Sequence, residues 1–199
     1  MIDALIISNI VLWIAVIALS VLVLALVRQI GVLHERVAPA GALMGSQGPR
    51  VGEAAPVMKI NDWSGAPVTV GGAVADGKST LLFFLSPTCP VCKTLLPVLD
   101  SVARSERSWL RLVFASDGPR AEHEAFVREH QLDERPYLLS TQLGLVYQVG
   151  KLPHAVLIDA AGVLRAKGLV NTREHIESLF EAMERGVGSV QEYLRREVA

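Results

Sequence analysis

The chain has 199 residues with a formal net charge of -1, and 51% of its residues are hydrophobic. Its length suits one domain with an appendage, and the lack of a basic excess argues against nucleic acid as a partner. Its two cysteines are separated by only two residues, which provides no framework of disulfides. The domain must therefore be stabilised by a hydrophobic core.

The N-terminal stretch over residues 4–27 contains no charged side chain. As a helix rising ~1.5 Å per residue it reaches about 36 Å, more than the roughly 30 Å hydrocarbon core of a bilayer. We therefore expect a transmembrane anchor within residues 1–30. A cleaved signal peptide is the alternative, since small residues occupy 37–40. However, the apolar run is longer than a signal h-region, and no lysine or arginine precedes it.

The segment that follows is punctuated by turn-forming residues. Residues 31–50 are rich in glycine, alanine and proline and predict a flexible tether, which leaves 51–199 as the folded domain. Short apolar alternations over 57–70 predict a hairpin around a Trp-Ser-Gly turn. A further Asp-Gly turn at 76–77 leads into an apolar strand over 80–85.

Cys89 and Cys92 follow this strand and a Ser-Pro break, at an expected helix start. Cys89 fits the N-cap, and Pro90 fits the first helical position, where its missing N–H costs nothing. The helix dipole and unpaired backbone N–H groups stabilise a thiolate there, which lowers the pKa of Cys89. Cys92 lies one turn later on the same face and can attack a mixed disulfide at Cys89. The pair therefore predicts a dithiol–disulfide exchange centre.

Alternating strand and helix patterns after the cysteines predict an α/β domain with a mixed central sheet. We expect a helix over 89–105 bent at Pro97, strands over 109–115, 137–139, 155–159 and 163–167, and helices over 121–130, from 141, over 173–184 and over 186–199. Asn171 or Thr172 is expected to cap the helix over 173–184, with Glu174 completing a capping box. The helix over 121–130 is expected to expose its histidines, His123 and His130, to solvent.

The stretch from the strand through Cys89–Lys93 to Pro97 resembles the active-site strand and helix of the thioredoxin superfamily. Residues 51–70 resemble the N-terminal hairpin of its membrane-anchored periplasmic branch. The resemblance covers about 51–184 and implies a thioredoxin-like fold.

A second matching segment, residues 147–159, is similar to the part of that superfamily that carries its cis-proline. The resemblance implies that Pro153 is the cis-proline. It also implies that Leu152 offers the backbone edge on which a substrate peptide binds.

The anchor, the run Ser86–Pro97 and the length are together most similar to the MauD family, accessory proteins for methylamine dehydrogenase maturation. This similarity implies a single-pass protein of the bacterial inner membrane whose domain faces the periplasm. Its client would be the disulfide-rich small subunit of methylamine dehydrogenase. Cys89 and Cys92 would be catalytic, served by an unidentified upstream redox partner and by no cofactor beyond their own disulfide. Two other functions stay open: a thiol reductant for cytochrome c maturation, and a non-catalytic chaperone with a thioredoxin fold.

Other uses of the cysteine pair are disfavoured by their sequence context. Zinc needs about four ligands, and the five histidines are scattered, so we expect no metal. A purely structural disulfide is also disfavoured, because a bridge between Cys89 and Cys92 closes too short a loop to stabilise the fold much. A peroxidase of the peroxiredoxin type requires a proline seven residues before the reactive cysteine, where this chain has Leu82.

Two carboxylates of the related proteins are absent. Classical thioredoxin has a buried aspartate where this chain has Phe83, and the cytochrome c maturation branch often has a glutamate where it has Leu95. Because both carboxylates handle protons in those relatives, we expect a narrow range of partners rather than fast, general-purpose reduction.

Overall fold

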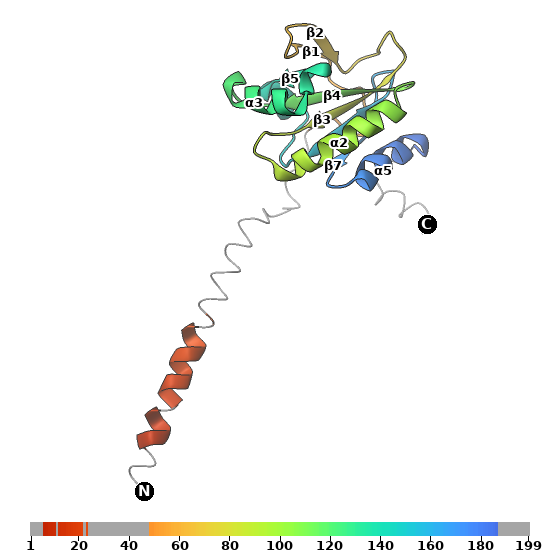
Figure 1. Cartoon of the computed structure of the whole chain (residues 1–199). Helices are drawn as coiled ribbons and strands as arrows, with labels where there is room; N and C mark the ends of the chain where they lie inside the picture. The colour runs from red at the N-terminus through yellow and green to blue at the C-terminus, as the bar shows by residue number, and fades with distance from the viewer. Residues whose placement is uncertain (1–5, 11, 22, 24–47, 187–199) are drawn as a thin grey trace. The chain divides into compact units, whose positions relative to one another are not determined.

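The computed structural model describes residues 6–10, 12–21, 23 and 48–186 (Figure 1). The chain consists of two units, Met1–Gly45 and Ser46–Ala199. In the first, the described residues are helical and their side chains are exposed. No helix among the described residues combines the length and the hydrophobicity that crossing a bilayer requires. The predicted anchor and tether lie partly, and the predicted C-terminal helix almost entirely, outside the described residues.

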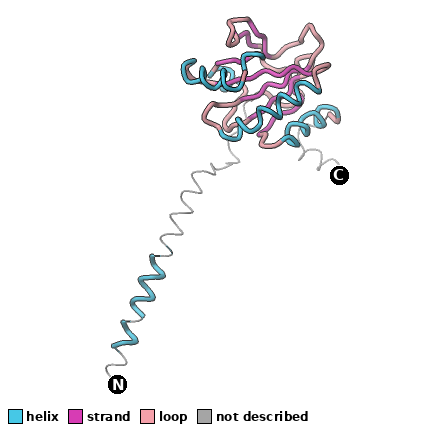
Figure 2. Tube along the Cα trace, in the orientation of Figure 1, coloured by secondary structure: helices cyan, strands magenta, loops and turns pink. Residues whose placement is uncertain are grey.

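The second unit is built on a mixed central sheet, whose strands are magenta in Figure 2. The sheet has five strands in the order β5-β4-β3-β6-β7. Its strands are β3 (Ser79–Phe84), β4 (Leu110–Ser116), β5 (Tyr137–Leu139), β6 (His154–Ile158) and β7 (Leu164–Leu169). β3 pairs parallel with β4 and antiparallel with β6. All residues of β3 are buried because the strand is central and covered on both faces. The predicted α/β fold with a mixed central sheet is confirmed.

Helices cover both faces of this sheet and enclose two apolar clusters. The helices are α2 (Pro90–Ser105), α3 (Arg120–His130), η1 (Leu132–Glu134), α4 (Thr141–Val146) and α5 (Arg173–Glu184). One cluster joins Leu99 of α2, Phe126 of α3 and Ile176 of α5 to one face of the sheet. The other joins Leu143 of α4 and Val70 to the opposite face. Figure 1 shows α2 and α5 running side by side along the sheet.

The predicted hairpin forms from β1 (Met58–Asn61) and β2 (Pro67–Val70), which pair antiparallel. Asp62 organises its turn, because its Oδ1 accepts hydrogen bonds from the backbone amides of Ser64 and Ala66, both at 2.9 Å. The hydrogen bond from the Ser64 hydroxyl is the main cause that lowers the pKa of Asp62. A bridge between Asp62 and Leu138 attaches the hairpin to the edge strand β5.

Of the two predicted caps of α5, Thr172 is confirmed, whereas the capping box from Asn171 to Glu174 is wrong. Thr172 is the N-cap, and its Oγ1 accepts a hydrogen bond from the amide of His175 at 3.4 Å. The helix therefore begins one residue later than a cap at Asn171 requires, and Glu174 is not at the third helical position.

The prediction that His123 faces solvent is also wrong. Its side chain is 1% exposed and lies between α3 and β5. Both ring nitrogens have hydrogen-bond partners, Tyr137 and the carbonyl oxygen of Asp117, and these offset the cost of burying the imidazole. The charged neighbours Glu122 and Glu124 do lie on the exposed side of α3.

Candidate functional site

The cysteine pair lies where β3 ends and α2 begins. Cys89 is the N-cap of α2, with extended backbone angles of φ -87° and ψ 108°, and Pro90 occupies the first helical position. The amide of Cys92 donates a hydrogen bond to the Sγ of Cys89 at 3.1 Å. This helix start is as predicted, because each residue has the backbone conformation that its local sequence favours.

Cys89 and Cys92 form a disulfide whose Cα atoms are 5.3 Å apart. Cys92 is fully buried, whereas Cys89 is partly exposed. An incoming thiolate can therefore reach only the sulfur of Cys89. This difference in exposure makes Cys89 the candidate nucleophile of the reduced form and Cys92 the candidate resolving cysteine.

A tight turn between the strand and the helix sets the position of Cys89. The amide of Cys89 donates to the carbonyl oxygen of Ser86 at 3.1 Å. The Ser86 hydroxyl lies 3.0 Å from that of Thr88 and accepts from the Thr88 amide at 3.3 Å. The sulfur is thereby held at the end of the sheet rather than on a mobile loop.

The predicted cis-proline lies at the same edge of the sheet. The peptide bond between Leu152 and Pro153 is cis, as expected from the resemblance. The register pairs Phe84, the last residue of β3, with His154, so Pro153 stands beside the strand end that leads to Cys89. The fold thus gathers all four predicted site residues, although Leu152 and Cys89 are far apart in the sequence.

Leu152 offers an accessible strip of backbone and side chain. Its side chain is 39% exposed. Within the described part of the chain, its backbone has no hydrogen-bond partner. On the inner side, Pro153 is buried and its carbonyl oxygen accepts from the amide of Val170 at 3.2 Å. An added strand that paired with the backbone of Leu152 would therefore displace no bond of the sheet.

The interior beneath the cysteines is apolar. Phe83 and Leu95, which replace the carboxylates of related proteins, are 0% and 3% exposed and belong to the same apolar cluster as Cys92. Lys93 is exposed, and its Nζ lies 5.8 Å from the centre of the Phe126 ring. Neither Phe83 nor Leu95 can therefore accept a proton from Cys92.

Several buried polar groups near this edge were missed by the sequence analysis. Burial, and secondarily the positive charge of Lys167, lowers the pKa of His154 to about 4, so this histidine is neutral at pH 7. Burial raises the pKa of Tyr137 to about 12. The bond of Tyr137 to His123 joins a strand to a helix 14 residues away in sequence, which no local pattern indicates. The described residues contain no cluster of three metal-binding side chains.

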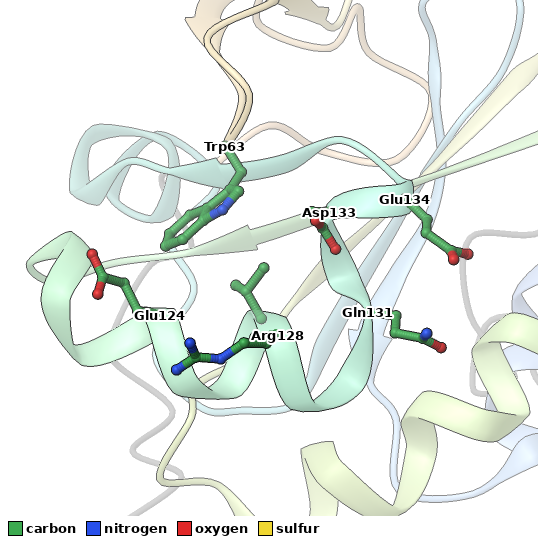
Figure 3. A pocket seen from close by; sticks show the side chains of 7 residues that line it. Trp63, Glu124, Arg128, Gln131, Asp133 and Glu134 are labelled. Atoms are coloured by element: carbon green, nitrogen blue, oxygen red, sulfur yellow. The ribbon is translucent and has the colours of Figure 1, made fainter.

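A separate pocket of about 460 Å³ lies between the β1–β2 hairpin, α3 and η1 (Figure 3). It is lined by Trp63, Glu124, Val127, Arg128, Gln131, Asp133 and Glu134. The Arg120 guanidinium lies 3.8 Å from the centre of the Trp63 ring, and Trp63 packs partly buried against the core. None of the predicted site residues lines this pocket.

Comparisons with known proteins agree with this geometry. Residues 51–167 match the AhpC/TSA family. The chain is 48% identical to the methylamine utilization protein MauD of Paracoccus denitrificans, over 96% of this chain and 94% of that protein. It is 49% identical to MauD of Methylorubrum extorquens, over 96% and 92% of the two chains.

Solved structures share the fold at low sequence identity. StoA from Bacillus subtilis aligns with a TM-score of 0.54 and 21% identity, covering 66% of this chain and 99% of StoA. The lipoprotein thioredoxin Etrx1 of Streptococcus pneumoniae aligns with a TM-score of 0.54 and 18% identity, covering 63% and 99%. The chain therefore belongs to the family of the methylamine utilization proteins MauD and to the AhpC/TSA family, and it shares its fold with these solved structures.

Proposed function

We propose that this protein assists the maturation of the methylamine dehydrogenase small subunit by thiol–disulfide exchange at Cys89 and Cys92, in methylamine utilization. The supporting observation is the bridged pair at a helix N-terminus, in a chain 48% identical over 96% of its length to a methylamine utilization protein. Cys89 is the attacking sulfur and Cys92 the resolving one. The exchange needs no cofactor besides this disulfide.

The exchange proceeds through one covalent intermediate. A client thiolate attacks the Sγ of Cys89, the bond between Cys89 and Cys92 breaks, and Cys92 leaves as a thiolate. A second client thiolate then attacks the client sulfur of this mixed disulfide and releases Cys89 as a thiolate. The client gains a disulfide and gives two electrons to the pair. The reverse sequence reduces a client disulfide through the same intermediate.

The client segment binds as an added strand beside the cis-proline. The unpaired backbone of Leu152 supplies hydrogen bonds to an extended peptide. Exposed apolar side chains are present on the adjoining segments. They are Val91 in the first turn of α2, Leu152 itself, and Leu169 of β7, which pairs with His154 of β6. A client strand at this edge passes over the sulfur of Cys89.

The domain is tethered to the inner membrane and faces the periplasm, with residues 1–30 as the anchor and 31–50 as the tether. The support is the charge-free stretch 4–27 and the exposed apolar side chains on its described helical residues. The periplasm suits the function because client disulfides persist in an oxidising compartment. Resistance of the full chain to alkaline carbonate extraction tests the anchor, and release of the protein by carbonate contradicts it.

The function is tested in a methylamine-utilizing bacterium whose own gene for this protein is deleted, grown on another carbon source with methylamine added to induce the enzyme. Expression of the parent chain is expected to restore correctly bridged small subunit and active methylamine dehydrogenase, and Cys89→Ser is expected to restore neither. Lys59→Ala, an exposed change on β1, is the matched control. An equal yield of bridged small subunit with Cys89→Ser contradicts the proposal.

Two further readouts in the same strains separate the alternatives. Loss of c-type cytochromes in the deletion strain would identify a cytochrome c reductant instead. Full activity in a variant that lacks both Cys89 and Cys92 would identify a chaperone that needs no thiols. We expect normal cytochromes and no activity.

A further inference from the structure

Three buried polar side chains lie together beside the active-site turn and take no part in the exchange steps. Ser116 at the end of β4 is 6% exposed, His123 in α3 is 1% exposed, and Tyr137 at the start of β5 is fully buried. Buried polar groups are costly unless they are hydrogen-bonded, so their bonds indicate what they hold in place.

The protons of this network can be assigned from its acceptors. The Nε2 of His123 lies 2.9 Å from the carbonyl oxygen of Asp117, which can only accept, so Nε2 carries the hydrogen. In the neutral imidazole Nδ1 then accepts from the Tyr137 hydroxyl at 2.7 Å. Ser116 lies near the Tyr137 hydroxyl, whose pKa it lowers against the larger, raising effect of burial. His123, held by Tyr137, thus fixes the carbonyl of Asp117, the residue that follows Ser116 in the chain.

Ser116 itself bonds to the end of β3. Its hydroxyl donates to the carbonyl oxygen of Leu85 at 2.8 Å. Leu85 lies one residue beyond the last sheet pair of β3, and no backbone amide of the described residues donates to its carbonyl. The sheet ladder therefore leaves this carbonyl to the side chain of Ser116.

The carbonyl of Leu85 and the amide of Ser86 belong to one rigid peptide plane. The carbonyl of Ser86 in turn accepts the amide of Cys89 at 3.1 Å. Fixing the plane before Ser86 therefore fixes the start of the turn that places Cys89 at the N-cap. Rotation of that plane would move the Cys89 sulfur relative to the Cys92 amide that faces it.

We infer that Ser116 is a positioning residue for Cys89, which acts by holding the Leu85–Ser86 peptide plane through its hydroxyl. This role rests on the proposed thiol–disulfide exchange at Cys89, but it does not depend on which client protein is served. Its effect is on the reactivity of the cysteine, because the N-cap geometry stabilises the thiolate.

The test is the pH dependence of iodoacetamide alkylation of Cys89 in the reduced full chain. A Cys92→Ser background leaves Cys89 as the single thiol. Ser116→Ala is expected to raise the apparent pKa of Cys89 by about 0.5 and to slow alkylation below that pKa about threefold. Ser116→Thr keeps a hydroxyl and is expected to restore the parent profile.

Ser79→Ala is the matched control, because Ser79 is a buried serine at the opposite end of β3 whose hydroxyl faces only the Met183 sulfur, at 4.0 Å. Denaturant midpoints are measured for every variant. A Ser116→Ala profile equal to that of Ser79→Ala overturns the inference, even if stability falls. So does a Ser116→Thr profile shifted as far as that of Ser116→Ala. If the Ser116 effect holds while bacterial maturation fails, the proposed client is wrong and the positioning role stands.

Discussion

The amide of Cys92 points at the sulfur of Cys89 from 3.1 Å, across the first turn of α2. This N–H belongs to the first turn of the helix, where backbone donors have no acceptor within the helix. The sulfur of Cys89 serves as its acceptor. After reduction the same donor faces the Cys89 thiolate. The two sulfurs therefore differ in charge stabilisation as well as in exposure, and this inequality sets the order of the exchange.

In the reduced protein we expect a thiol reagent to modify Cys89 and spare Cys92. Cys92 is 0% exposed, whereas Cys89 is partly exposed at the N-cap. Iodoacetamide under native conditions, followed by N-ethylmaleimide in denaturant, labels the two sites differently, and fragmentation mass spectrometry reads the labels. Equal native labelling of both sulfurs would show that the buried position of Cys92 is wrong.

Replacing the resolving cysteine is expected to trap the intermediate. Cys92→Ser leaves Cys89 able to attack a client disulfide but removes the thiolate that releases it. A mixed disulfide should accumulate on a non-reducing gel when the variant meets a disulfide-bonded peptide. Cys89→Ser is the control and should form no such species. Trapping through Cys92 instead would reverse the assigned roles.

Removal of the Tyr137 hydroxyl is expected to cost about 1–2 kcal/mol in the free energy of unfolding. Tyr137→Phe leaves the buried Nδ1 of His123 without its partner at 2.7 Å. Tyr147→Phe is the matched control on the other face of the sheet, where the hydroxyl makes one longer bond, 3.4 Å to the carbonyl of Pro56. Urea denaturation measures both variants. An equal loss in the free energy of unfolding for the two variants would mean that the hydrogen bond to His123 does not stabilise the fold.

His154 is expected to make the fold less stable in mild acid. Burial lowers its pKa from 6.5 to about 4 in the folded chain. Between these values the unfolded chain binds more protons. The contribution of neutral His154 to the free energy of unfolding is therefore complete above pH 6.5. It is lost as the pH falls to about 4, and the loss reaches about 3 kcal/mol.

His154→Phe keeps a ring next to Phe84 and removes the titrating group. Denaturation at pH 7 and at pH 4 is expected to show a smaller difference for this variant than for the parent. The exposed histidine variant His175→Gln serves as control and should match the parent. A parent-like pH difference in His154→Phe would exclude this residue as the source.

The turn between β6 and β7 is expected to tolerate no side chain at Gly162. Its φ of +83° favours glycine, and a Cβ there would lie 2.4 Å from the backbone carbon of Gly72. Gly162→Ala should cost about 3 kcal/mol or more. Gly77→Ala has a similar φ of +70° but open space around it, and should cost about 1 kcal/mol. Thermal unfolding measures the loss of stability in both variants. The loss in Gly77→Ala reports the backbone strain alone, and the larger loss in Gly162→Ala adds the steric clash with Gly72. Equal losses would contradict this close approach.

The sequence by itself determined the redox centre and the local elements around it. The spacing of Cys89 and Cys92, the adjacent Pro90 and the preceding apolar strand each favour the same backbone conformation, so a local pattern sufficed. The cis bond before Pro153 followed from resemblance, since no local rule distinguishes it from other strand-entry prolines. The N-terminal anchor remains a prediction from the sequence, because the described residues of that stretch do not test it.

Only the tertiary structure decided which polar groups are buried beside that centre. The charges around His123 predict a solvated face, yet the ring turns inward because Tyr137 and Asp117, from other segments, satisfy both of its nitrogens. Ser116 reaches Leu85 across 31 residues of sequence. Helical and strand periodicities describe neighbours within one element, whereas hydrogen-bond partners between elements depend on sheet order and packing, which the chain acquires only when it folds.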